Sequence, residues 1–94
     1  MAPVVTPPVP SPGANEVWMQ NTTFVPSQKT ISVGTTITWT NKDTADHDVS
    51  SNTGVFSSPT MGKNATFSYT FNTKGTYNYV CVFHSGMTGT IIVQ

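Results

Sequence analysis

The chain has 94 residues, enough for one small domain and near the lower limit of what stays folded without extra help. Charged residues make up only 9% of it, and four lysines balance four acidic residues, so the formal net charge is zero. Because this composition offers no basic surface, we expect neither a nucleic-acid partner nor binding to an anionic membrane. The single cysteine, Cys81, excludes an internal disulfide, so a metal ion or close core packing has to supply any extra stability.

The N-terminal segment differs in composition from the rest of the chain, with prolines at positions 3, 7, 8, 10 and 12. Such a segment favours extended polyproline geometry, so we interpret residues 1–15 as a linker or tail and residues 16–94 as the folded domain. We expect no membrane-spanning segment in the chain, because no apolar run is long enough. A spacer suits a tethered domain. We therefore expect an extracytoplasmic location, in a periplasm-like space or at a cell surface, with a membrane tether N-terminal to the domain; a plain disordered tail is the alternative.

From residue 16 onward, apolar and polar residues alternate in short runs, which is typical of β-strands. We expect the first three strands at residues 17–20, 29–33 and 35–41. Turn residues separate them at 24–27, at position 34 and at 41–43. In the second of these strands the alternation places Ile31 and Val33 on one face.

The second half continues the β pattern, with strands expected at 65–71, 76–81 and 89–93. Before these strands, residues 50–63 are rich in Ser, Asn and Gly and include Pro59, and we expect an irregular crossing with Phe56 and Met61 as apolar anchors. No window carries the 3.6-residue period of a helix. The sequence therefore predicts an all-β fold, a Greek-key β-sandwich of seven to eight strands.

The residues most suggestive of function lie near the C-terminus, in the pattern Cys81-x-x-His84-x-x-Met87. The other histidine of the chain, His47, lies 34 residues before the cysteine. One thiolate and two imidazoles with a weak axial thioether form the ligand set of a mononuclear blue-copper site. Because copper alternates between Cu(I) and Cu(II), this set predicts a protein that carries single electrons.

Each of these residues also has a purely structural interpretation. A lone cysteine is often a buried apolar filler, a histidine near a strand end often bonds the backbone, and a methionine often packs in a core. Zinc can occupy the same ligands, although the divalent affinity order favours copper. Two alternatives to an electron carrier stay open: a small-molecule redox enzyme at an open copper site, for example on nitrogen oxides, and a copper-binding or structural sandwich.

Residues 16–94 resemble the cupredoxins, the family of small blue-copper proteins that includes the plastocyanins and the amicyanins. The most specific likeness is in residues 81–89, Cys-Val-Phe-His-Ser-Gly-Met-Thr-Gly, whose short His-to-Met spacing is most similar to that of amicyanins. A second likeness is in residues 31–43, which lead to the first histidine.

The resemblance implies one type 1 copper ion per chain, with equatorial ligands His47, Cys81 and His84 and with Met87 as the axial ligand. It also implies a monomeric one-electron carrier rather than an enzyme. In the family the second histidine, here His84, reaches the surface inside an apolar patch where redox partners dock. The candidates for this patch are Phe83 and Gly86, with Phe56 or Met61 as further members.

Two departures from the family pattern concern the surroundings of the metal. Asp46 and Asp48 flank the first histidine, where the family often has proline and asparagine, and Ser85 follows the second histidine in place of proline. Unlike proline, Ser85 has a backbone N–H, which together with the N–H of Asp48 is expected to donate to the sulfur of Cys81 and to favour Cu(I). An ionised Asp48 carboxylate near the copper would favour Cu(II) instead.

Overall fold

The computed structural model describes residues 10–94, so most of the predicted linker, residues 1–9, lies outside the described part. The described residues form eight strands: β1 (Glu16–Met19), β2 (Phe24–Val25), β3 (Gln28–Ile31), β4 (Thr35–Asn41), β5 (Ser50–Ser51), β6 (Thr66–Phe71), β7 (Gly75–Val80) and β8 (Thr88–Val93). They contain no helix that is long and apolar enough to cross a membrane. The prediction of an all-β fold of seven to eight strands is confirmed.

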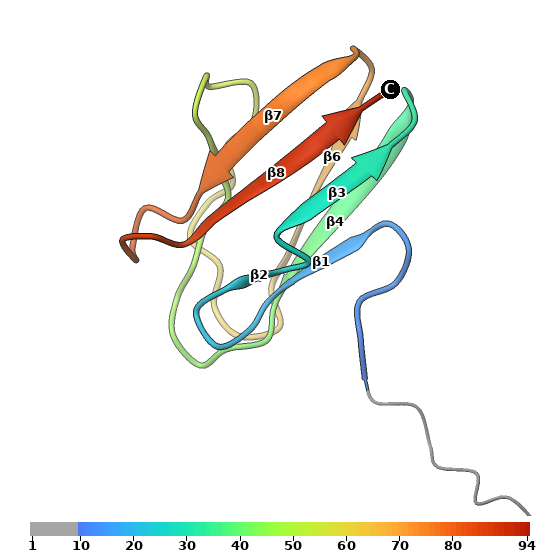
Figure 1. Cartoon of the computed structure of the whole chain (residues 1–94). Helices are drawn as coiled ribbons and strands as arrows, with labels where there is room; N and C mark the ends of the chain where they lie inside the picture. The colour runs from blue at the N-terminus through green and yellow to red at the C-terminus, as the bar shows by residue number, and fades with distance from the viewer. Residues whose placement is uncertain (1–9) are drawn as a thin grey trace, which may run out of the picture.

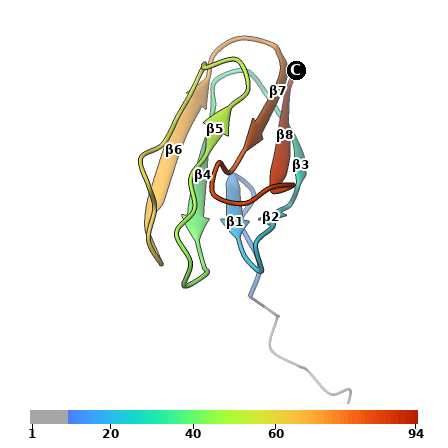
Figure 2. The same cartoon turned by 90° about the vertical axis from the view of Figure 1, so that its left-hand side faces the viewer.

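The strands form two sheets of four, in the orders β2-β1-β4-β6 and β3-β8-β7-β5 (Figures 1 and 2). The chain passes from one sheet to the other after β2, β3, β4, β5 and β6, so consecutive strands are mostly in different layers. Two pairs, β1 with β4 and β3 with β8, are parallel, and the other pairs are antiparallel. The sheets therefore pack face to face as a sandwich with the crossing connections of a Greek key.

Aromatic side chains fill the space between the sheets, with the fully buried Trp39 of β4 at their centre. Its ring lies 5.4–6.4 Å, between centroids, from those of Phe56, Phe67, Phe71 and Tyr79. The ring of Tyr79 covers Gly89 on the neighbouring strand, where any Cβ would overlap it. This aromatic layer supports the strands whose ends carry the predicted ligands.

One predicted turn is wrong, because Phe24–Val25 forms β2 and pairs with β1. Phe24 is buried in the core, and the turn precedes it, with Asn21 and Thr22 both in the left-handed region at φ 55° and 57°. A strand of two residues is too short to produce an alternation in the sequence. The adjacent Pro26, a typical turn residue, therefore led to the prediction of a turn at residues 24–27.

Two segments differ from expectation in smaller ways. The strand expected at residues 29–33 ends at Ile31, and Val33 is 43% exposed in the turn that leads to Gly34, whose φ is +92°. Residues 50–63 are mostly irregular, as predicted, but they begin with β5, which pairs with β7.

Candidate metal centre

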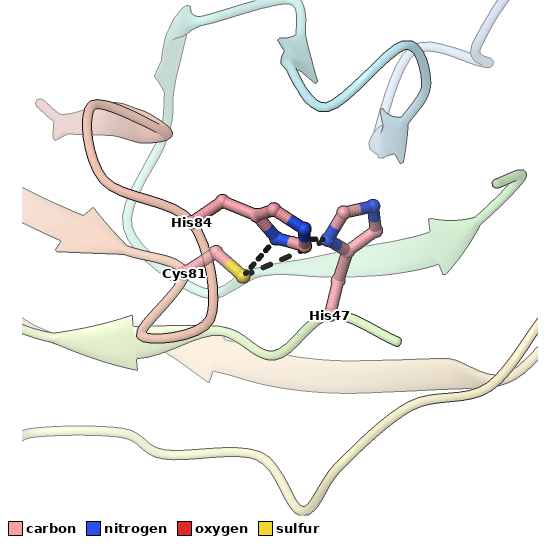
Figure 3. A group of neighbouring side chains, drawn as sticks. All are labelled: His47, Cys81 and His84. Atoms are coloured by element: carbon pink, nitrogen blue, oxygen red, sulfur yellow. Dashed lines mark hydrogen bonds between the residues drawn. The ribbon is translucent and has the colours of Figure 1, made fainter. Parts of the chain in front are cut away.

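Two segments that are far apart in the sequence supply the predicted ligands. His47 lies in the segment that follows β4, and Cys81 comes directly after β7, at the start of the connection to β8. Both strands end at the same end of the sandwich, at the lower left of Figure 1. The fold thus brings His47 next to Cys81 and His84 (Figure 3).

The backbone around His47 is held by a dense set of hydrogen bonds. The N–H of His47 donates to the carbonyl of Met61 at 3.1 Å, and the N–H of Met61 donates back at 2.8 Å. The buried side chain of Asn41 donates to the carbonyls of Ala45 and Met61, both at 2.9 Å. His47 is completely buried, so its position is fixed by the scaffold.

The ring of His47 is oriented by a carboxylate. Its Nε2 lies 2.8 Å from Oδ2 of Asp43, and a carboxylate only accepts, so Nε2 donates and the lone pair of the ring is on Nδ1. The backbone N–H groups of Asn21 and Thr22 donate to the same carboxylate at 2.8 and 2.9 Å. Partial burial acts to raise the pKa of Asp43, but these donors outweigh it and lower the pKa below its ordinary value.

The second segment is a short loop closed on itself. The N–H of Cys81 donates to the carbonyl of Met87 at 3.0 Å, and the N–H of Met87 donates to the carbonyl of His84 at 3.2 Å. The carboxylate of Asp48 accepts the N–H of Val82 at 2.8 Å and so joins the loop to the segment that carries His47.

Three atoms that could donate a lone pair to a metal ion face one another where the two segments meet (Figure 3). Nδ1 of His47 lies 3.2 Å from Nδ1 of His84, and Sγ of Cys81 lies 3.6 and 3.7 Å from these two nitrogens. The centre of such a triangle is about 2.0 Å from each corner, the length of a metal–imidazole bond and slightly short of a metal–thiolate bond near 2.3 Å. The site therefore fits a metal ion with trigonal nitrogen and sulfur ligands, the arrangement of a blue-copper centre.

The three residues are unequally shielded from solvent. His47 and Cys81 are buried, with 0% and 3% of their surface exposed, whereas His84 is partly exposed. Met87 is also buried, at 3% exposed, and its backbone carbonyl accepts the N–H of Cys81. Its role as the axial ligand stays a prediction.

The structure corrects the predicted apolar patch. Phe56 and Met61, at 4% and 2% exposed, lie in the core and cannot belong to it. The candidates Phe83, at 49% exposed, and Gly86 are both exposed. Val82, which the sequence reasoning missed, is 63% exposed and carries no sequence signal of its exposure.

Sγ of Cys81 lies within hydrogen-bonding distance of the two imidazole nitrogens. Donation to this sulfur from the N–H groups of Ser85 and Asp48 stays a prediction. Sequence reasoning also missed Asp43, which it treated only as a turn residue. Its one sequence signal is its place four residues before His47.

Comparison with known proteins agrees with this geometry. Residues 10–93 match the sequence profile of the cupredoxin-like domain family. The chain is 34% identical over 87 residues to amicyanin-alpha of Methylorubrum extorquens, and the match covers 87% of this chain and 73% of that protein. It is 36% identical over 69 residues to the amicyanin of Paracoccus denitrificans, covering 68% of this chain and about half, 53%, of that one.

Among solved structures, an amicyanin mutant in its Cu(I) form superposes on this chain with a TM-score of 0.81. The two are 32% identical in sequence, and the match covers 89% of this chain and 85% of the other. The profile match extends over nearly all of the described residues. The chain therefore belongs to the cupredoxin family.

Proposed function

We propose that this protein carries single electrons on one type 1 copper ion. Nδ1 of His47, Sγ of Cys81 and Nδ1 of His84 would hold the ion, and the thioether of Met87 would be the fourth, weaker ligand. The observation that carries this proposal is the triangle of donor atoms, with sides of 3.2–3.7 Å. Copper bound there supplies a one-electron couple between Cu(I) and Cu(II).

The protein holds these donors in one arrangement by bonds that do not involve a metal. His47 is fixed through Met61 and Asp43, and Cys81 through the backbone of its own loop. Because neither set of bonds depends on the oxidation state of an ion, the ligands move little when an electron arrives or leaves. A small rearrangement keeps the barrier to electron transfer low.

Electrons leave and enter through His84, the one equatorial ligand that is partly exposed. We name Val82, Phe83 and His84 the exit patch; its first two side chains are 63% and 49% exposed and uncharged. Redox proteins dock on this patch weakly and briefly, with interfaces below about 1,200 Å². The protein acts as a monomer, and specificity for the partner comes from the shape of the patch.

The proposed location is outside the cytoplasm. The sandwich, residues 16–94, is the electron-carrying domain, and residues 1–15 form a spacer that leads to a membrane tether. The support for this arrangement is the run of prolines, which favours an extended chain. The spacer keeps the exit patch within reach of membrane-bound and soluble partners.

A copper titration tests the proposed function. Metal-free protein given one equivalent of Cu(II) is expected to develop an intense visible band, because charge transfer from the Cys81 thiolate to copper absorbs there. Cys81→Ser is the matched control: it removes the only thiolate but changes one atom, so the band is lost while far-UV circular dichroism is unchanged. A band that survives this substitution would show that the ligand assignment is wrong.

The same sample separates an electron carrier from an enzyme with an open copper position. If Met87 shields the axis, added azide leaves the visible band unchanged at millimolar concentration. A saturable shift of the band would instead show a vacant position where a small molecule binds. The buried position of Met87, at 3% exposed, favours the carrier.

A further inference from the structure

The carboxylate of Asp43, which helps to fix His47, also carries a charge that the function proposed so far does not use. The side chain of Asp43 accepts three hydrogen bonds on its two oxygens: from the N–H of Asn21 at 2.8 Å, from the N–H of Thr22 at 2.9 Å and from Nε2 of His47 at 2.8 Å. It therefore lies between the turn that joins β1 to β2 and a predicted copper ligand.

We propose that Asp43 is a positioning residue that makes this turn part of the metal centre and biases the copper towards Cu(II). It holds the His47 ring with its proton on Nε2 and its lone pair on Nδ1, directed at Cys81. The proposal rests on the proposed function for its redox consequence, but the effect on the ring is independent of any metal.

The charge of Asp43 acts on the metal through the ring. A carboxylate bonded to the second nitrogen of a ligating imidazole makes that imidazole a stronger base, and a stronger base stabilises the more highly charged ion. Screening by water is limited here, because the side chain of Asp43 is only 18% exposed and that of His47 is not exposed at all. The negative charge therefore favours Cu(II) over Cu(I) and lowers the reduction potential.

The backbone of the turn holds the carboxylate in place through two hydrogen bonds. Asn21 and Thr22 both have left-handed backbones, at φ 55° and 57°, a conformation that is strained for the β-branched Thr22. This conformation directs two successive N–H groups to the same side, where they form a concave site for an anion. Asp43 occupies that site, so the strained turn and the orientation of His47 are parts of one arrangement.

Only a carboxylate satisfies all three donors. An asparagine at position 43 has a single acceptor oxygen, and its NH₂ group would face either a backbone N–H or the ring N–H. Asp43→Asn is therefore the sharp variant, because it keeps the shape and removes both the charge and one acceptor. Asp46→Asn is the matched control: it removes the same charge one residue from His47, but its exposed carboxylate makes no hydrogen bond among residues 10–94.

The redox experiment compares the reduction potentials of the wild type and the two variants by voltammetry. Loss of a bond partner behind a ligand typically weakens metal binding about 10–100-fold, and here we expect Cu(II) affinity to fall more than Cu(I) affinity. A tenfold difference between the two corresponds to a rise of about 59 mV for a one-electron couple. We expect this rise in Asp43→Asn and a much smaller one in Asp46→Asn; equal shifts in both would overturn the proposal.

A second measurement uses metal-free protein and does not require the variant to fold. Proton–nitrogen NMR of the wild type is expected to show the His47 proton on Nε2, in a signal that exchanges slowly with water. A proton on Nδ1 instead would overturn the positioning role. If wild-type protein bound copper without a thiolate band, the proposed function would fail, and this NMR measurement would still decide the role of Asp43.

Discussion

The two segments that supply the metal ligands are built in different ways. The segment around His47 is bonded to three other parts of the chain, through Asn41, Asp43 and Met61, and its ligand is completely buried. The loop of residues 81–87 is bonded mainly to itself, and Val82 at its start is 63% exposed. One segment is therefore fixed by the scaffold and the other faces solvent.

This difference separates two requirements of an electron carrier. A fixed ligand keeps the geometry of the metal the same in both oxidation states, whereas an accessible ligand gives partners a short path to the metal. In the proposed function, the first task falls to His47 and the second to His84. Besides the contacts among the ligand atoms themselves, the two segments are joined by the N–H of Val82, which donates to the carboxylate of Asp48.

The largest expected effect comes from removing each histidine in turn. Both His84→Gly and His47→Gly lose the visible band of the copper-loaded protein. Added imidazole at millimolar concentration is expected to restore the band in His84→Gly, because that position is open to solvent, and not in His47→Gly, where the site is sealed. Titration of both variants with imidazole, followed by visible absorption, checks this. Equal recovery would contradict the division of tasks.

An intermediate effect is expected on stability. Asn41→Ala removes a side chain that donates to the carbonyls of Ala45 and Met61 and accepts the N–H of Asp43. These bonds support the segment that carries His47. Because three hydrogen bonds of a fully buried side chain are then lost, the free energy of unfolding of metal-free protein should fall by about 3 kcal/mol. Urea unfolding measures it.

The matched control for Asn41→Ala is Ser85→Ala, on the exposed loop, which should change the free energy of unfolding by less than about 0.5 kcal/mol. A comparable loss of stability in both variants would mean that the loop is held as firmly as the segment around His47. In that case the contrast between the two segments would not survive.

The smallest effect concerns the aromatic layer under both segments, and it is visible only at alkaline pH. Burial raises the pKa of Tyr79 from 10.0 to about 12. Between these values the unfolded chain has already lost the phenolic proton that the folded chain keeps, so stability falls as pH rises, by roughly 2–3 kcal/mol in total. Tyr79→Phe should remove this part of the alkaline loss, while its stability at neutral pH changes little, because the buried hydroxyl has no hydrogen-bond partner within residues 10–94.

Comparison of urea unfolding curves for the wild type and Tyr79→Phe at pH steps from neutral to alkaline isolates the contribution of this one group. All other side chains are common to the two proteins, so the difference between the curves belongs to position 79. Parallel loss of stability in the two would show that Tyr79 does not retain its proton.

Most of the fold was predictable from the sequence where strands are long enough to show alternation. β4 and β6 match the predicted strands to within a residue, and in β6 three aromatic residues face inward between Thr and Ser. β2 was not predictable, because two residues carry no period. The parallel pairing of β1 with β4 was not predictable either, because it depends on where the chain returns rather than on local pattern.

The metal centre was predictable to the extent that its residues are local or rare. Cys81 and His84 are three residues apart, and His47 stood out because the chain has two histidines. The role of Asp43 was hidden, since its bonds to Asn21 and Thr22 span 22 and 21 residues and need the folded turn. The exposure of Val82 in the ligand loop was hidden too, because it depends on the conformation of the folded loop.

The unequal burial of the three ligands has a consequence for how a metal ion reaches them. His47 and Cys81 are buried, at 0% and 3% exposed, whereas His84 is partly exposed. An incoming ion would therefore meet His84 before it reached the other two ligands. The side chain proposed to exchange electrons would then also lie on the path of metal uptake.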